Sequence, residues 1–196
     1  YGGGDHAEYS GPPQPKATTR CRIVSEHGWA DLVGPTVCRT LTPDEVAVVR
    51  GKLGPDPLNA DADPGQFYRV AAKSSRPIGV ILMDQAAISG VGNIFRAESL
   101  YRQKIDPLRP GKTLSDDELR RLWDDNKHLL TIGVRVGRII TTEQQDRPGI
   151  PETEAWPDHA NYVYMRHGQK CPRCSATIRM EEIAGRKLYW CPGCQK

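Results

Sequence analysis

The sequence predicts an α+β fold of three parts: a few short strands, a helical middle and a C-terminal β-hairpin. Three observations lead to this prediction. Short β-like runs occupy the chain up to residue 40, helix start signals follow from Thr42, and two Cys-x-x-Cys pairs flank two strand-like runs near the C-terminus. With 196 residues, the chain has the length of one large domain or two small ones.

Composition excludes several classes of protein. Apolar residues make up 38% of the chain, below the ~45–50% of a typical globular domain, which suits several small cores joined by polar segments. The mean hydropathy of -0.57 and the lack of a long apolar run predict no membrane-spanning helix. Residues 1–20 have no apolar core of a signal peptide. Because the first residue is Tyr1 and not methionine, we expect a piece of a longer protein.

Charge is concentrated at the C-terminal end. The net charge is +3, yet residues 161–196 carry seven basic and two acidic side chains, and the rest of the chain carries 20 basic and 22 acidic ones. A basic segment on a nearly neutral body favours a polyanionic partner. A solvated surface has the same composition, so charge alone leaves both interpretations open.

The N-terminal part, residues 1–40, is predicted to contain short strands. Weak alternation over residues 21–24 indicates one strand, residues 29–33 a second, and residues 36–38 a third. A few short strands cannot bury a core by themselves. We therefore expect them to be the remnant of a larger sheet.

Residues 41–142 are predicted to form a helical domain. Its first helix start signal is at Thr42, which can cap the helix. Pro43 suits the first helical position, and Glu45 completes a capping box with Thr42. Similar patterns predict helices that start near residues 63, 77, 93 and 115.

The longest predicted helix begins at Ser115. Glu118 completes a capping box with Ser115, and Leu114 is placed to pack against Leu119. After this helix, residues 143–160 hold several prolines and acids and are expected to form an irregular loop. The apolar face of the helix is predicted to consist of Leu119, Leu122, Trp123, Leu129, Leu130 and Val134.

Two Cys-x-x-Cys pairs with sixteen residues between them predict a metal site. Such turns direct two thiolates each at one tetrahedral ion, at ~2.3 Å, and the spacing falls in the range of zinc sites. Strand-like runs at residues 176–180 and 186–190, joined by a turn at Ala184 and Gly185, would bring the pairs together. The predicted ligands of one structural Zn²⁺ ion are Cys171, Cys174, Cys191 and Cys194.

Disulfides and a redox dithiol are the alternatives to zinc. Nothing indicates secretion, which disfavours disulfides, and no βαβ unit accompanies the pairs, which disfavours a redox site. Four cysteines leave no open coordination position, so the site is expected to be structural. Cys21 and Cys38 have no partner ligands in view and are expected to be small core residues.

Gly90, Gly92 and Asn93 lie between two predicted helices. Glycines allow a sharp turn and the close approach of another molecule. The amides at the start of the following helix would then form an anion site, with the Asn93 side chain as a further donor. Glycines also serve packing at helix corners, so the turn alone is weak support for a binding site.

These residues resemble the Fpg/Nei family, the formamidopyrimidine-DNA glycosylases and endonuclease VIII. The matching segments are residues 82–85, 88–98, 163–169 and the cysteine-rich end, and the last of these resembles the actinobacterial endonuclease VIII branch. The resemblance implies the remnant of an N-terminal β-sandwich, a helix–two-turns–helix domain at residues 41–142 and a zinc-ribbon β-hairpin at residues 161–196.

The resemblance also implies a partner and site residues. Double-stranded DNA with oxidised bases or abasic sites would lie between the two halves of a monomer. Asn93 matches the family asparagine that binds a phosphate beside the lesion, and Arg186 matches the hairpin arginine that holds the same backbone. Gly90 and Gly92 would allow the backbone of DNA to approach. Tyr1 and Gly2 would end the wedge that replaces the flipped base.

The family's chemistry implies base excision followed by strand cleavage through β,δ-elimination. It begins at an N-terminal proline with an adjacent glutamate, and no Pro-Glu pair opens this sequence, so the resemblance assigns no catalytic residue here. The chain used alone is therefore expected to be inactive and to form no borohydride-trapped complex with DNA. A bacterial, cytoplasmic, nucleoid-associated repair enzyme is implied. The alternative is a non-catalytic zinc-dependent nucleic-acid-binding module.

Overall fold

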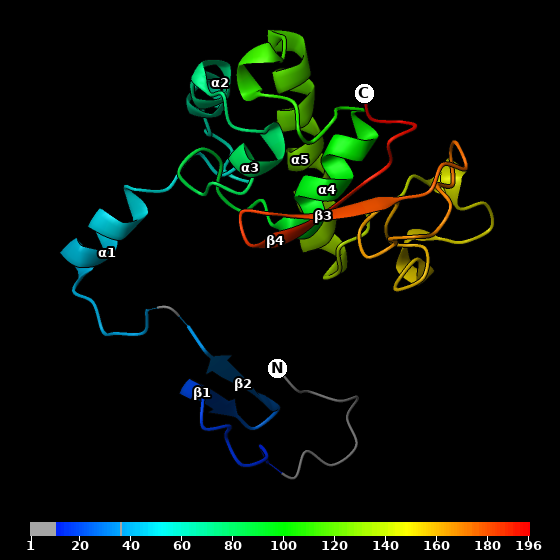
Figure 1. Cartoon of the computed structure of the whole chain (residues 1–196). Coiled ribbons are helices and arrows are strands. Elements are labelled where there is room, and N and C mark those ends of the chain that lie inside the picture. The colour runs from blue at the N-terminus through cyan, green and yellow to red at the C-terminus, as the bar shows by residue number, and fades with distance from the viewer. Residues whose placement is uncertain (1–10, 36) are drawn as a thin grey trace. The chain divides into compact units, whose positions relative to one another are not determined.

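The computed structural model describes residues 11–35 and 37–196, so the wedge expected at Tyr1 and Gly2 lies outside the described residues. The chain divides into two compact units, residues 1–48 and 49–196 (Figure 1). The division falls inside a helix that the sequence assigns to the helical domain, so the boundary expected at residue 40 stays a prediction. No helix in the described part is long and apolar enough to cross a membrane.

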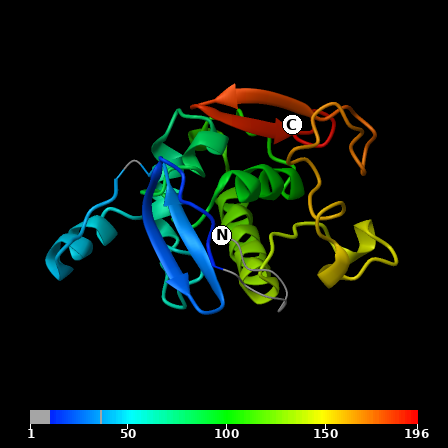
Figure 2. The ribbon, with the colours of Figure 1, turned by 90° about the horizontal axis from the view of Figure 1, so that it is seen from below.

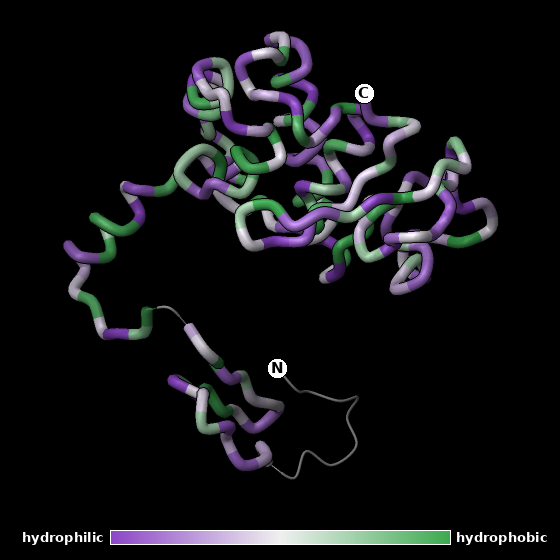
Figure 3. The backbone as a smooth tube through the Cα atoms, in the orientation of Figure 1, coloured by the Kyte–Doolittle hydropathy of each residue, from purple (hydrophilic) through white to green (hydrophobic). Residues whose placement is uncertain are grey.

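The first unit contains an antiparallel hairpin of β1 (Thr19–Ser25) and β2 (Gly28–Val33). Two of the three predicted strands are present, but Val37 and Cys38, in the third, belong to no strand, and residue 36 lies outside the described residues. Figure 3 shows hydrophobic segments in this hairpin, and Ile23 and Val24 are exposed. Cys21 and Cys38 are exposed as well, so the expectation that they are core residues is wrong. Within the described residues, the two-stranded sheet that holds Cys21 has no second layer, and Cys38 lies outside the strands.

Helix α1 (Pro43–Arg50) begins at the predicted start signal. The backbone N–H of Thr42 donates to Glu45 Oε2 at 2.9 Å, and the N–H of Glu45 donates to Thr42 Oγ1 at 3.3 Å, which completes the capping box. None of its residues is buried, so capping and not packing defines this helix.

The second unit is built on four α-helices that surround one core. They are α2 (Gly65–Lys73), α3 (Ile78–Ile81), α4 (Asn93–Arg102) and α5 (Asp116–Val136). Helix α3 starts near the predicted position and is only one turn long. The core collects buried side chains from all four helices, among them Phe67, Ile78, Phe95, Leu100, Leu122 and Trp123.

Helix α5 confirms most of its predicted features. Ser115 and Glu118 form the capping box, through N–H donors at 2.8 Å and 3.2 Å. Glu118 also pairs with Arg109 at 2.7 Å, and this hydrogen bond lowers its pKa to about 2. The predicted apolar face is buried except at Val134, which is 71% exposed, because the core ends before the last turn of the helix.

The C-terminal hairpin pairs β3 (Arg179–Ile183) with β4 (Arg186–Trp190). Its turn is at Ala184 and Gly185, as predicted, and both residues have positive φ. The first strand starts later than expected because residues 176–178 pair with residues 168–171 instead: Ile178 N–H donates to Gln169 O at 2.9 Å. The hairpin lies alongside α4 (Figures 1 and 2).

Residues 141–160 include two short 3₁₀ helices, Gln144–Asp146 and Glu152–Glu154. A small cluster of Ile140, Ala155 and Ala160 packs this segment against the end of α5. The segment is irregular, as expected, but it has buried residues of its own.

Glu98 joins α4 to the strand-free segment before the cysteines. Its carboxylate is fully buried and accepts hydrogen bonds from the Thr141 hydroxyl at 2.6 Å and from three consecutive backbone N–H groups at 2.7–2.8 Å. Those N–H groups belong to residues 162–164. Burial raises the pKa of Glu98, whereas the four donors favour its ionised form. Glu98 therefore fixes where the C-terminal module attaches to the helices.

Candidate nucleic-acid interface

The turn at residues 89–92 is held rigidly by the side chain of Gln85. Its Nε2 donates to Val91 O at 2.9 Å, and its Oε1 accepts from the N–H of Gly90 at 3.0 Å. Gly90 has φ +84°, a conformation that side-chain-bearing residues rarely adopt. At Gly92, a Cβ atom would meet no protein atom within 4 Å, so this side of the turn is open to an approaching molecule.

Helix α4 begins directly after this turn. Gly92 is its N-cap and supplies no side-chain cap, so the first N–H groups of the helix remain available as donors. The positive end of the helix dipole lies at the same point. A helix N-terminus of this kind can attract an anion, so the anion site expected here stays a prediction.

Asn93 connects this helix to the tip of the β3–β4 hairpin. Its Nδ2 donates to Lys187 O at 3.0 Å, and its Oδ1 accepts from Arg96 Nη2. Since an amide nitrogen carries two hydrogens, one donor of Asn93 remains for a ligand. Asn93 thus has a structural role that the sequence does not reveal: it joins the turn to the hairpin.

Arg96 is the residue of this site that sequence reasoning missed. It is 1% exposed, and Arg96 Nη2 also donates to Lys187 O at 3.1 Å. Burial lowers the pKa of Arg96 to about 10, and repulsion by the nearby Arg186 adds to this effect. Within the described residues, neither arginine forms an ion pair with a carboxylate. The sequence does hold one signal for Arg96: it lies three residues after Asn93, so both side chains are on the same side of the helix.

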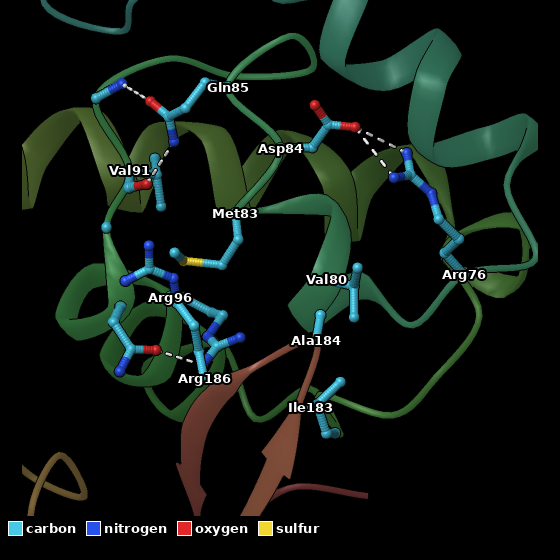
Figure 4. A pocket seen from close by; sticks show the side chains of 13 residues that line it. Arg76, Val80, Met83, Asp84, Gln85, Val91, Arg96, Ile183, Ala184 and Arg186 are labelled. Carbon is cyan, nitrogen blue, oxygen red and sulfur yellow. Dashed lines mark hydrogen bonds and ion pairs between the residues drawn. The ribbon is translucent and has the colours of Figure 1, made fainter. Parts of the chain in front are cut away.

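These groups line an open hollow of about 580 Å³ between the turn and the hairpin tip (Figure 4). Arg76 lines the opposite side but is neutralised by Asp84, at 3.0 Å. The hollow therefore carries two unbalanced positive charges at one end and an apolar wall beside them. That wall is formed by Val80, Met83, Ile183 and Ala184.

The four predicted cysteine ligands lie together at the base of the hairpin. All four sulfurs lie within 4.8 Å of one another. The Cys171–Cys194 and Cys174–Cys191 sulfur pairs are 3.8 Å and 3.3 Å apart, close to the ~3.8 Å that a tetrahedron with ~2.3 Å zinc–sulfur bonds requires. The cluster fits one Zn²⁺ ion with no open position.

A second layer of contacts supports the cysteine cluster. The N–H of Cys191 donates to Gln195 Oε1 at 2.8 Å, and Gln195 Nε2 donates to Ile105 O at 2.9 Å, just beyond α4. Tyr189 and Trp190 are buried in this region. The metal site is thus fastened to the helical core.

Two domain families match the chain in the same order as these parts. Residues 53–145 match the formamidopyrimidine-DNA glycosylase H2TH domain, and residues 168–196 match the zinc finger found in FPG and IleRS. Endonuclease 8 1 of Mycobacterium tuberculosis is 43% identical over 184 residues, which cover 93% of this chain and 68% of that protein. The chain belongs to the Fpg/Nei family of DNA glycosylases.

Other members of the Fpg/Nei family extend this result. Formamidopyrimidine-DNA glycosylase of Thermus thermophilus is 38% identical over 150 residues, covering 74% of this chain and 54% of that protein. Among solved structures, a complex of Lactococcus lactis Fpg with abasic-site DNA superposes with a TM-score of 0.63 at 27% identity, over 80% of this chain and 57% of that one. The chain thus spans about two thirds of the mycobacterial relative and little more than half of the Fpg proteins. Like the family's zinc finger, its cysteine cluster is a structural zinc site.

Proposed function

We propose that this chain binds the phosphate backbone of damaged double-stranded DNA through the hollow between the Gly90–Gly92 turn and the hairpin tip, as part of a base-excision repair glycosylase/AP lyase. The observation that carries the proposal is the pair Arg96 and Arg186, whose charges no carboxylate balances in the described part of the chain. Arg96 is buried, and a buried cation without a counter-ion is costly unless an anion joins it, whereas Arg186 is exposed and free to contact a ligand.

The geometry favours a phosphate over other anions. A phosphate offers several acceptor oxygens, and this site presents a helix N-terminus, one free amide hydrogen of Asn93 and the planar guanidinium of Arg186. Gly92 keeps the approach free of side chains. The apolar wall of the hollow suits the sugar that lies between neighbouring phosphates.

Each residue then has a role in binding. Arg186 would contact a phosphate oxygen directly, and Asn93 would donate to it. Arg96 would add charge from behind and hold both the turn and the hairpin in place through Lys187 O. The zinc site keeps the hairpin, and so Arg186, at the correct distance from α4. The proposal concerns one copy of the chain on chromosomal DNA that contains oxidised bases or abasic sites.

Replacing Arg186 by alanine should weaken DNA binding about ten-fold at fixed salt, because one charge-assisted contact is lost. The slope of log K against log salt concentration should fall by about one. Fluorescence anisotropy with an abasic-analogue duplex over a range of salt concentrations measures both quantities. Arg179→Ala is the matched control, because Arg179 is an exposed hairpin arginine outside the hollow.

The two variants distinguish binding in the hollow from general electrostatic attraction of DNA to the basic hairpin. If Arg186→Ala and Arg179→Ala lower affinity equally, the hairpin attracts DNA by its general charge and the hollow is not the site. Asn93→Ala should weaken binding too, but it also removes the contact with Lys187 O, so Arg186 is the cleaner test. A change in base-sequence preference at constant salt slope would contradict a phosphate contact.

Replacing Gly92 by alanine should leave the fold intact and impair binding. Its φ is −107°, which any residue adopts, and the new Cβ would meet no protein atom within 4 Å. The methyl group would project into the space through which the DNA backbone approaches. We expect an unchanged melting temperature and a several-fold weaker DNA affinity. Unchanged affinity would mean that the backbone of DNA does not come close to this turn.

A further inference from the structure

The hydroxyl of Tyr101 lies 3.2 Å from Cys171 Sγ, one of the four zinc-ligating sulfurs. Tyr101 is in the last turn of α4 and is 0% exposed, and Cys171 is 2% exposed. Water is therefore excluded from this contact. It joins a helix of the DNA-binding domain to a residue 70 positions later in the chain.

The chemistry of a bound zinc ion fixes the direction of this hydrogen bond. A zinc-bound cysteine is a thiolate and carries no hydrogen, so the tyrosine O–H must be the donor. Four thiolates around Zn²⁺ leave a net charge of about −2 on a partly buried cluster. Each hydrogen-bond donor that points at a sulfur reduces the free-energy cost of burying that charge. In the described part of the chain, no other side-chain hydroxyl lies within hydrogen-bond distance of the four sulfurs.

The tyrosine ring is held by two neighbouring side chains, which restrict the position of its hydroxyl. It stacks on Tyr162 with ring centres 4.9 Å apart. The guanidinium of Arg173, which lies between the ligands Cys171 and Cys174 in the chain, covers both rings at 5.5 Å and 4.6 Å. Arg173 is itself fixed by Asp146 at 2.6 Å.

We propose that Tyr101 is a positioning residue of the zinc centre, whose hydroxyl donates to the Cys171 thiolate and thereby retains the metal. Such outer partners of metal ligands contribute to affinity because they orient the ligand and stabilise its charge. Helix α4 then holds the hairpin at both ends. Asn93 and Arg96 bind its tip through Lys187 O, and Tyr101 binds its base through Cys171.

Tyr101→Phe in the full chain tests the proposal, because it removes the hydroxyl and keeps the stacked ring. Zinc release to the chelator 4-(2-pyridylazo)resorcinol should be about ten-fold faster than in the unaltered protein. In the cobalt-substituted protein, the sulfur-to-cobalt charge-transfer band should move to longer wavelength, since a thiolate without its donor gives up charge more easily. Tyr189→Phe is the matched control, because this buried tyrosine is in the same module and its hydroxyl makes no hydrogen bond within the described residues.

Faster release together with the band shift, in Tyr101→Phe and not in Tyr189→Phe, is the expected result. Faster release without a band shift would show that the hydroxyl supports the module without a hydrogen bond to the thiolate. An unchanged release rate would show that the hydroxyl does not help to retain the metal. Either outcome overturns the proposal. A measurement on the unaltered chain decides the matter if the variant does not fold. In the ¹¹³Cd-substituted protein, the Tyr101 hydroxyl proton should exchange slowly with water and show a scalar coupling to ¹¹³Cd. The absence of this coupling would also overturn the proposal.

Discussion

Replacing Cys191 by serine should abolish stoichiometric zinc binding, unfold the β3–β4 hairpin and eliminate specific DNA binding. The hairpin is a two-stranded sheet whose buried side chains are few, so the metal must supply much of its folding free energy. Structural zinc contributes on the order of 10 kcal/mol in comparable small modules. The helices should survive, because their core is a separate cluster around Leu100 and Leu122.

Metal analysis after dialysis, amide NMR of the hairpin and DNA-binding assays measure the three effects. Cys38→Ser is the matched control, since Cys38 is exposed and lies outside the cluster. It should keep about one equivalent of zinc and full affinity. One equivalent of zinc in Cys191→Ser, or unchanged DNA binding without zinc, would contradict the account.

Replacing Glu98 by glutamine should destabilise the second unit by about 3 kcal/mol. Both carboxylate oxygens accept backbone N–H groups: Oε1 those of Val163 and Tyr164, and Oε2 that of Tyr162. An amide can offer an oxygen on one side only, so its NH₂ group must face at least one backbone N–H donor. That leaves buried donors unsatisfied, and each costs about 1–3 kcal/mol.

Denaturant unfolding followed by helical circular dichroism measures this loss. Glu181→Gln is the matched control, because Glu181 is exposed on β3 and makes no hydrogen bond through its side chain in the described residues. It should change the free energy of unfolding by less than about 0.5 kcal/mol. If Glu98→Gln is equally mild, the carboxylate does not attach residues 162–164 to α4 as described.

The sequence predicts correctly those features that depend on interactions between neighbouring residues. The capping boxes at Thr42 and Ser115 and the turn at Ala184 depend only on nearby residues, and all three are present. The cysteine spacing determines the metal cluster for the same reason. These features fix where elements begin and how the hairpin closes.

The sequence does not predict burial and side-chain contacts that depend on segments far apart in the chain. Val134 fits the apolar periodicity of α5 but lies beyond the core, and Cys21 has no covering layer in the described residues. Arg96 gains its role only when Lys187, 91 positions away, is placed beside it. Tyr101 likewise meets Cys171 only through the fold. Contacts of this kind require the tertiary structure.

The central claim is that Arg186 and the turn before α4 hold one phosphate of a damaged duplex. The most direct measurement replaces single phosphates beside an abasic analogue by neutral methylphosphonates and compares the affinities of the unaltered chain and Arg186→Ala. We predict that one position costs the unaltered chain about ten-fold and costs the variant almost nothing, because the same contact is already absent. Equal losses in both proteins at every position would contradict the claim.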